Sequence, residues 1–529
     1  MSETLDFIDF QAVLCYTIYM INETEAAEMA AEITYLKQKV QLLEEQLRLA
    51  RHHRFGASSE KTPSGQLSLF NEAEAIADPD LPEPDIEQAV PRRRKQKGKR
   101  EEDFSGLPTE QVVYELPENE RVCPECGGPI HACGHALLRR ELTVIPARYV
   151  VKEHVQTTYS CRRCEKYAEP VPMKKAPIPA PVIKNSGICS PSLLAQVLYN
   201  KYVLALPLYR QEADLKSLHI HLSRQTMANW VIAAHGLWFS PLFDLFHARL
   251  LESEHAHADE SVVQVLREEG RKPQTKSYMW VYRTAEKVAR PVVLFDYKPS
   301  RAGECAAQFL QGFKGHLHTD GYAGYHCKLP DEITVVGCWA HMRRYLTDTL
   351  KILEEDVRPF HPANKGLEYC NQLFALEKEF KKRELHPEER HKARQEQSKP
   401  ITKKFFAWAR DEHDQNLLPE SAYGEALTYA RNQKKWLLRY LDDGNLDISN
   451  NLMERSVRPY ALGRKNWLFC NVPAGAKASA AVYSIVETAK ANELNPFEYL
   501  KFLLERLPQG VSPESCLPWN SDAQLLCKQ

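Results

Sequence analysis

The chain has 529 residues, which is too long for one ordinary hydrophobic core, so we expect about three or four domains. Apolar residues make up 43% and charged residues 26%, as in ordinary globular proteins, and this excludes a wholly disordered polypeptide. The formal net charge is -1, so any binding of nucleic acid must come from local clusters of charge rather than from a global attraction.

The first residues carry no membrane signal. The longest early apolar run covers residues 12–21, about half of the roughly 20 residues that a membrane helix needs. Its upstream flank is acidic, unlike that of a secretory signal. Four of the 14 cysteines form two CxxC pairs and the others are scattered, which favours a metal site over a secreted disulfide framework. We therefore expect a cytoplasmic protein with no membrane partner.

Residues 26–54 have the spacing of a short coiled coil within an N-terminal region, residues 1–61. Leu36, Val40, Leu43 and Leu47 alternate steps of four and three, which places them on one helical stripe. We favour self-association into a homo-oligomer, and the alternative is an amphipathic helix packed on the protein's own core. Residues 62–112 follow as a linker with an acidic block and then the basic run RRRKQKGKR, either solvated or in contact with phosphate.

Residues 113–169 form a small predicted zinc-binding domain. Two CxxC pairs, Cys123 with Cys126 and Cys161 with Cys164, supply four thiolates, the ligand set of a closed tetrahedral zinc site. The alternative is reduced structural thiols. One ligand could also be replaced by a neighbouring donor, namely Cys133, His131, His135 or His154.

Residues 182–251 have helical apolar spacing and form a possible DNA-binding region. Residues 209–230 resemble a helix, a tight turn and a second helix that opens at the capping residue Ser223. Arg224 and Gln225 follow this cap, where a DNA-reading helix presents its side chains. Plain helical packing explains the pattern equally simply and is the alternative.

Residues 252–341 change to the period of β-strands. Alternating residues at 257–266, 277–284 and 291–298 predict three strands, followed by a helix at 303–313 and strands at 315–320 and 333–338. This is the strand order of a ribonuclease-H-like core. A helical, highly charged insertion is expected at 342–445, closing helices at 446–507 and a tail at 508–529. The fold class is thus multidomain α+β.

Three acids from distant elements are candidate metal ligands. Asp259 lies in the first strand, where Glu260 should face the other way, and Asp320 ends a short strand before Gly321. Glu454 lies in the first turn of a helix that Asn450 or Asn451 can cap. Two metal ions about 3.5–4 Å apart can activate a nucleophile and neutralise a leaving oxygen on phosphate. A cluster of carboxylates offsets the repulsion between the two ions.

Other polar residues surround these acids in the sequence. Basic side chains that could contact DNA follow Glu454, although a surface ion-pair network would look the same: Arg455, Arg458, Arg464 and Lys465. Cys338 and His341 form a CxxH to which we assign a structural or DNA-contacting role. His255 and His257 flank Asp259 at strand spacing, and we interpret them as satisfied imidazoles rather than ligands.

At these residues the chain resembles transposases of the insertion-sequence 66 family. The matching strings cover nearly the whole chain: FGASSEK, CPECGG, CRRC, ADE, TDGYAGY, GCWAHMRR, NNLMERSVRPYALGRKNWLF and ETAKANELNPFEYL. The resemblance implies a zipper-like N-terminus, a zinc-binding domain and a DDE catalytic core whose acids are Asp259, Asp320 and Glu454. One departure is Ser449, where the family usually has an Asp before the two Asn residues.

The predicted function is DDE transposition, in which element ends are cleaved and then joined to target DNA. It requires two Mg²⁺ (or Mn²⁺) ions held by the three acids, together with a structural Zn²⁺. The partners are element ends, target DNA, a second copy of the chain and possible accessory proteins of the same element. The alternatives are a catalytically silent DNA-binding descendant and a nuclease or resolvase without a joining step.

Overall fold

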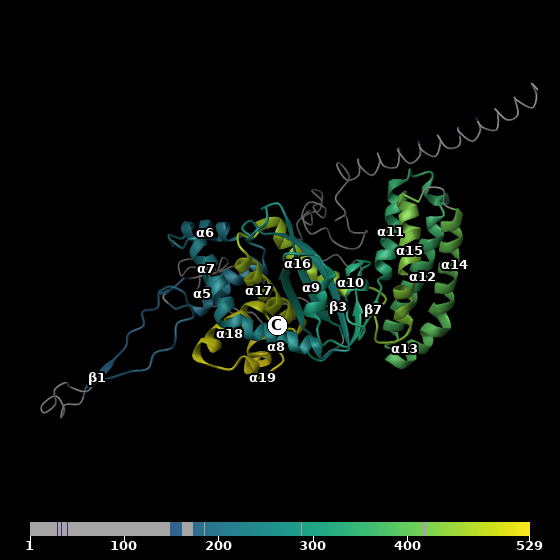
Figure 1. Cartoon of the computed structure of the whole chain (residues 1–529). Coiled ribbons are helices and arrows are strands. Elements are labelled where there is room, and N and C mark those ends of the chain that lie inside the picture. Colours follow the sequence, from purple (N-terminus) through teal and green to yellow (C-terminus); the bar gives the residue numbers. More distant parts are fainter. Residues whose placement is uncertain are drawn as a thin grey trace, which may run out of the picture. The chain divides into compact units, whose positions relative to one another are not determined.

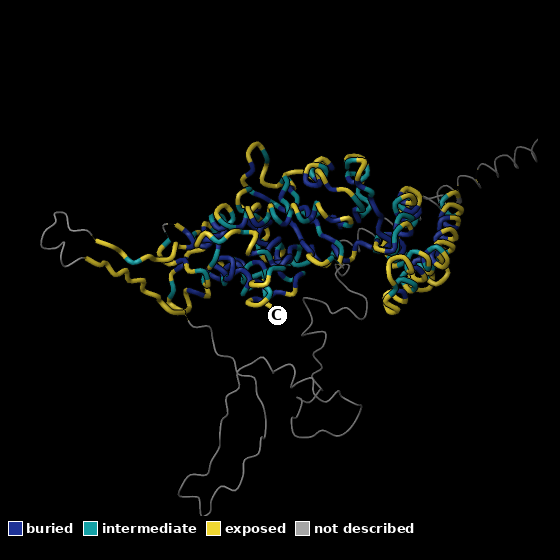
Figure 2. The backbone as a smooth tube through the Cα atoms, turned by 90° about the horizontal axis from the view of Figure 1, so that it is seen from below, coloured by how far each residue is buried: buried dark blue, intermediate teal, exposed yellow. Residues whose placement is uncertain are grey.

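The computed structural model describes residues 149–160, 173–184, 186–286, 288–415 and 419–528, together with Met29, Ile33 and Val40. The described residues fall in two compact units that divide at residue 177. In the smaller unit, strands β1 (Thr158–Ser160) and β2 (Met173–Lys175) pair in antiparallel fashion, and every residue of both strands is exposed (Figure 2). The second strand lies in the Pro-rich residues 170–181, between the predicted zinc-binding domain and the predicted helical region.

The larger unit opens with a helical region, as the sequence predicts. Its elements are α5 (Pro191–Tyr202), α6 (Leu208–Ser217), α7 (Arg224–Ala234), the π-helical turn η2 (His235–Phe239) and α8 (Ser240–Leu251). The predicted cap at Ser223 is present, because its Oγ accepts from the backbone N–H of Thr226 at 3.1 Å. The two-helix pattern over residues 209–230 is thus confirmed, whereas its contact with DNA stays a prediction.

A five-stranded sheet follows, in the spatial order β5-β4-β3-β6-β7. Its strands are β3 (His255–Gln264), β4 (Lys276–Thr284), β5 (Val293–Lys298), β6 (Gly315–His318) and β7 (Ile333–Val336). The first three are antiparallel neighbours, and β6 and β7 add in parallel to β3. Helix α9 (Gly303–Phe309) makes the crossover from β5 to β6, and the short helix α10 (Gly324–Cys327) precedes β7.

Different helices cover the two faces of the sheet. On one face Tyr282 stacks on Phe309 of α9, with ring centroids 4.2 Å apart, and Trp280 meets Tyr325 of α10. The opposite face carries Phe295, which packs against helices α16 (Asn451–Trp467) and α17 (Pro473–Ala491). Successive residues of a strand therefore meet different partners.

Hydroxyl groups of α17 bind the backbone N–H groups along the outer edge of β5. The backbone N–H groups of Val293 and Phe295 donate to Oγ1 of Thr488 at 3.0 Å and to Oγ of Ser484 at 2.8 Å. An unpaired strand edge exposes such groups to other chains, and these side chains satisfy them within the molecule.

The predicted charged insertion is a helical bundle. Its helices are α11 (Trp339–Ile352), the turn η3 (Arg358–Phe360), α12 (Ala363–Lys382), α13 (Pro387–Ala393), the turn η4 (Arg394–Ser398), α14 (Lys399–Gln415), α15 (Ala422–Leu438) and the turn η5 (Arg439–Leu441). Helices α11, α12, α14 and α15 pack together (Figure 1) and enclose a second hydrophobic cluster that includes Trp339, Phe405 and Leu427. The insertion therefore has a core of its own.

One charged residue of the insertion is completely buried. Arg394 donates to both carboxylate oxygens of Glu377 at 2.7 Å and to the carbonyl oxygens of Tyr440, Asp443 and Leu446, each at 2.8 Å. A guanidinium that donates to five acceptor atoms holds the segments that carry these atoms in fixed positions. Arg394 therefore determines the path by which the chain leaves the insertion.

The chain then closes the sheet with α16 and α17, followed by α18 (Pro496–Arg506), the turns η6 (Leu507–Gln509) and η7 (Pro513–Cys516), and α19 (Ser521–Cys527). Tyr202 of α5 donates to or accepts from Ser479 of α17 at 3.0 Å, so the helical region packs on these closing helices. None of the helices in the described part of the chain is both long and apolar enough to cross a membrane.

Candidate active site

Asp259 and Asp320 lie at the same level beside the parallel ladder of β3 and β6. In this ladder His257 is the partner of His318, and each acid follows two residues later. Asp259 lies midway along β3, whereas β6 ends at His318, two residues before Asp320, so the strand is shorter than the sequence predicts. The two carboxylates are close enough for the charge of Asp320 to raise the pKa of Asp259.

Two rows of histidines lie below the acids on the same face. His257 stacks on His318, with ring centroids 4.7 Å apart, and His255 stacks on His316 at 5.4 Å. His318 is fully buried, and burial together with the neighbouring His257 holds its pKa well below the ordinary value. The buried imidazole of His318 is therefore neutral, so it stacks on His257 without charge repulsion.

Helix α16 begins beside Asp259 because its N-cap residue is anchored to β3. The side chain of Asn450 accepts from Nδ1 of His257 at 2.8 Å and donates to the carbonyl oxygen of Ala258 at 3.0 Å. The backbone N–H of Asn450 donates to Sγ of Cys338 at 3.1 Å. Glu454, in the first turn of α16, is thereby brought toward the two aspartates.

The carboxylate of Glu454 is held by helix α11. Arg344 donates from one terminal nitrogen to both carboxylate oxygens, at 2.8 and 3.0 Å, and Nε2 of His341 lies 3.7 Å from the nearer one. Both residues of the CxxH motif therefore contact the helix that carries Glu454. Cys338 anchors the helix cap, and His341 lies against the carboxylate itself.

The three acids influence one another electrostatically. Burial raises the pKa of Asp259 well above its ordinary value, and the negative charges of Glu260, Asp320 and Glu454 raise it further. A divalent cation would relieve this repulsion, and carboxylate oxygens are the ligands that Mg²⁺ prefers. The residues therefore fit such an ion, provided that Glu454 releases Arg344. Among the described residues, the three acids do not form a group whose ligand atoms all lie within 4.8 Å of one another.

Glu260 points to the other face of the sheet, where it has partners of its own. It accepts from the hydroxyl of Tyr325 at 2.8 Å and lies 2.6 Å from a terminal nitrogen of Arg301. Burial raises the pKa of Glu260, and these two partners oppose the rise. The alternation that separates it from Asp259 follows the sequence prediction.

The turn after Asp320 packs against the insertion. Oδ1 of Asp320 accepts from the backbone N–H of Tyr322 at 3.0 Å. A Cβ on Gly321 would lie 2.5 Å from the ring of Tyr429 in α15, so only glycine allows this close approach. The insertion therefore contacts the segment that carries the second acid.

Comparison with known proteins adds the decisive observation. The family model described as "Transposase IS66 family" matches residues 186–478, which is more than half of the chain and contains all three acids. The chain belongs to the IS66 family of transposases. The model described as "IS66 C-terminal element" matches residues 484–519.

Two further models of the IS66 group match the N-terminal part. The one described as "zinc-finger binding domain of transposase IS66" covers residues 120–165, and the one described as "Transposase C of IS166 homeodomain" covers residues 42–112. The four predicted zinc ligands, Cys123, Cys126, Cys161 and Cys164, lie outside the described residues. So do Leu36, Leu43 and Leu47 of the predicted coiled coil, and the linker of residues 62–112.

The similar proteins include three from Sinorhizobium fredii, each named only as an uncharacterized protein. The protein y4jD is 29% identical over 429 residues, covering 78% of this chain and 80% of its own. The protein y4hP is 30% identical over 429 residues, covering 78% and 74%, and y4qI is 32% identical over 359 residues, covering 65% and 64%. These relatives extend the family match through most of the chain.

The predicted DNA-contacting residues are spread over the surface of this IS66 chain. Arg224 is exposed and lies 3.9 Å from Glu212, while Gln225 donates to Asn229 at 3.1 Å. On α16, Arg455 pairs with Glu286, whereas Arg464 donates to the carbonyl oxygen of Val262.

Among the described residues, the cation that pairs with Glu454 is Arg344, 110 residues away. It is not one of the four basic residues that follow Glu454 in the sequence. Arg458 and Lys465 lie on the same stripe of α16 as Glu454, at spacings of four and eleven residues.

Proposed function

We propose that this chain is a DDE transposase that cleaves the DNA ends of its element and transfers them to target DNA. The observation that carries the proposal is the position of Asp259 and Asp320 at the same level beside the β3–β6 ladder, with Glu454 brought toward them by the anchored helix α16. The family match adds an independent reason, because it covers the same residues. The sheet of three antiparallel and two parallel strands supports assignment of the core as ribonuclease-H-like.

Asp259, Asp320 and Glu454 would hold two Mg²⁺ or Mn²⁺ ions. Bound there, the ions would activate the attacking water or 3′ hydroxyl and stabilise the leaving oxygen. The chain's own residues do the rest. Arg344 orients the carboxylate of Glu454 until the site is filled, and Arg458 and Lys465 offer cations along the helix for the phosphates of a bound strand.

The other parts of the chain would recognise and pair the element ends. The helices that meet at Ser223 present Arg224 and Gln225 for contact with DNA. The module of residues 113–169 would be stabilised by one zinc ion on its four cysteines, because metal binding of this kind contributes directly to folding. The N-terminal helix would pair protomers so that two ends are cleaved together.

The test is a comparison of cleavage with binding. Glu454→Gln removes a charge and keeps the shape, so the purified protein should bind labelled element ends normally and lose Mg²⁺-dependent nicking. Glu487→Gln is a matched control, because Glu487 lies on α17, the next helix, and pairs with Lys490 at 2.8 Å. Normal nicking by Glu454→Gln would overturn the assignment of the third acid, and loss of nicking in Glu487→Gln would then make Glu487 the next candidate.

The same assay separates the alternatives. A wild-type protein that nicks ends but never joins them to target DNA is a nuclease or resolvase. A wild-type protein that binds ends and produces neither nicks nor joined products in Mg²⁺ or Mn²⁺ is a silent DNA-binding descendant. Strand-transfer products that require Asp259, Asp320 and Glu454 support the transposase.

A further inference from the structure

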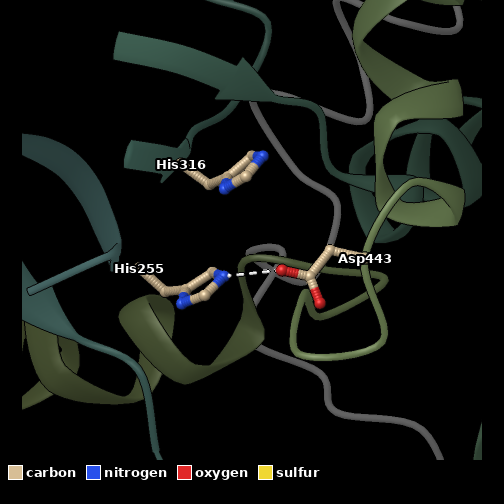
Figure 3. A group of neighbouring side chains, drawn as sticks. All are labelled: His255, His316 and Asp443. Carbon is tan, nitrogen blue, oxygen red and sulfur yellow. Dashed lines mark hydrogen bonds and ion pairs between the residues drawn. The ribbon is translucent and has the colours of Figure 1, made fainter. Parts of the chain in front are cut away.

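At the far end of the histidine stack from the acids, three metal-binding side chains come together. His255 of β3, His316 of β6 and Asp443 bring their ligand atoms within 4.8 Å of one another (Figure 3). His255 lies four residues before Asp259, or roughly 13 Å along the strand, so this group is separate from the proposed catalytic acids.

The donor atoms already face one another. Nε2 of His255 donates to Oδ2 of Asp443 at 3.1 Å, which is close to the roughly 3.3 Å that separates two ligands of a tetrahedral ion bound at about 2.0–2.1 Å. The rings of His255 and His316 lie 8° from parallel (Figure 3). Among the described residues, the imidazole of His316 has no hydrogen-bond partner, so its nitrogens are free to bind an ion after a side-chain rotation.

Asp443 is held in place by groups outside the cluster. Its second carboxylate oxygen, Oδ1, accepts from the backbone N–H of Asn445 at 2.8 Å and from its side-chain amide at 3.0 Å. Its backbone carbonyl accepts from the buried guanidinium of Arg394 at 2.8 Å. Such outer contacts orient a ligating carboxylate and leave Oδ2 directed at the histidines.

Solvent reaches Asp443 from the surface. A pocket of about 290 Å³ reaches Asp443 and its neighbours Asp442, Gly444 and Asn445, and neither histidine lines it. All three ligand side chains are partly exposed, which gives an ion access to them.

We propose that His255, His316 and Asp443 form a binding site for one zinc ion, distinct from the predicted cysteine site and from the three acids. Two imidazoles and one carboxylate suit Zn²⁺, whereas Mg²⁺ prefers an all-oxygen set. The ion joins strands β3 and β6 to the segment that leads from the insertion into α16. The ion therefore holds the start of α16, the helix that bears Glu454, against the sheet.

The experiment is a titration of the metal-free, tag-free full chain with Co²⁺, followed by absorption. Cobalt on the predicted four-cysteine site shows thiolate-to-metal charge transfer, whereas cobalt on nitrogen and oxygen shows only ligand-field bands. Wild-type protein should bind one equivalent with the intense ligand-field bands of a low-coordinate nitrogen and oxygen site, and added Zn²⁺ should displace it. Cobalt held by the three acids through oxygen and water gives far weaker bands. His316→Asn should lose this equivalent and keep the thiolate signal, because the apo imidazole makes no hydrogen bond whose loss would disturb the fold.

Two further variants complete the test. Asp443→Asn should also lose the equivalent while retaining the oxygen that Asn445 binds. His247→Asn is the matched control, because His247 is a partly buried histidine that contacts the carbonyl oxygen of Phe309 at 2.7 Å and lies outside the cluster. Identical cobalt stoichiometry and spectra in wild type and His316→Asn would overturn the proposal, as would a loss in His247→Asn of the same size. None of these readouts depends on DNA cleavage, so the proposal stands or fails separately from the proposed function.

Discussion

Arg344 donates to both carboxylate oxygens of Glu454, at 2.8 and 3.0 Å, across 110 residues of sequence. A metal ion that binds Glu454 has to displace at least one of these hydrogen bonds. Arg344→Gln should therefore lower the Mg²⁺ concentration for half-maximal end cleavage by about fivefold, the equivalent of roughly 1 kcal/mol for a half-exposed ion pair. Cleavage assays over a series of Mg²⁺ concentrations measure this.

Arg343 provides the control for that variant. It is the preceding residue of α11, and its Nε donates to Asn371 at 2.8 Å rather than to an acid of the site. Arg343→Gln should leave the Mg²⁺ requirement unchanged. An unchanged or higher requirement in Arg344→Gln would mean that Arg344 supports metal binding instead of competing with it.

Asp259→Asn should stabilise the metal-free protein. Because burial and nearby acids raise the pKa of Asp259, the folded state keeps this proton to a higher pH than the unfolded chain does. Above the ordinary Asp pKa the unfolded state binds fewer protons, so stability falls as the pH rises through this window. Removing the charge should add on the order of 1 kcal/mol to the free energy of unfolding at neutral pH.

Urea unfolding in chelator at neutral pH and at about pH 4 checks this. The gain should shrink at the lower pH, where Asp259 is protonated in the wild type. Asp331→Asn, at an exposed aspartate, should show no gain at either pH. A gain of equal size at both values would assign the effect to something other than the charge.

Glu260→Gln should lower stability and retain most of the end cleavage. Its buried carboxylate accepts from Tyr325 and pairs with Arg301 on the face away from the acids, whereas glutamine offers one oxygen to both partners. We expect the lost hydrogen bond to outweigh the relief of the buried charge that raises the pKa of Glu260, with a net cost of about 1 kcal/mol of stability. End cleavage should fall by less than about tenfold. Unfolding curves and cleavage rates of the same preparation test both parts. Loss of cleavage with unchanged stability would exchange the roles of Glu260 and Asp259.

Zinc in the N-terminal module depends on the four cysteines that the sequence predicts as ligands. Cys161→Ser should lower the zinc content of the full chain by about one equivalent and abolish the thiolate charge transfer of the cobalt protein. Cys327→Ser, at an exposed cysteine of the larger unit, is the control and should change neither. Full zinc content in Cys161→Ser would exclude this cysteine as a ligand.

Self-association depends on the stripe that contains Leu43. Leu43→Glu places a charge among apolar residues of the predicted coiled coil and should lower the mass found by sedimentation equilibrium. Gln41→Glu, off the stripe, adds the same charge and should leave the mass unchanged. If both variants retain the wild-type mass, the stripe packs within its own chain.

Local patterns identified the elements that carry the acids, because their signals are contained in a few residues. Alternation located β3 and β4 and separated Asp259 from Glu260. The Asn pair marked the start of α16, although the side chain of Asn450 does not cap the helix and binds β3 instead. The partners of these acids could not be predicted in this way. Arg344 reaches Glu454 only after the insertion folds back, and no local spacing records that contact.

The insertion contains a second example. Its charge-rich sequence is typical of solvated helices, and many of its side chains are exposed, yet Arg394 is completely buried. The carbonyl oxygens that it binds lie about 50 residues downstream, at Tyr440, Asp443 and Leu446. Composition alone does not distinguish a cation with such partners from one in water. His255 is a satisfied imidazole, as predicted, but its partner could not be named for the same reason, since Asp443 lies 188 residues away.

The segments by which the chain enters and leaves the insertion lie side by side. The backbone N–H of Gly337 donates to the carbonyl oxygen of Trp436 at 3.0 Å, and that of Trp339 donates to Ile448 at 3.1 Å. Because the two ends are held together, the entropy of closing the intervening loop grows only slowly with its length. The distal bundle can therefore be lengthened, shortened or exchanged while the two segments on either side of it, which lead to β7 and to α16, stay the same distance apart.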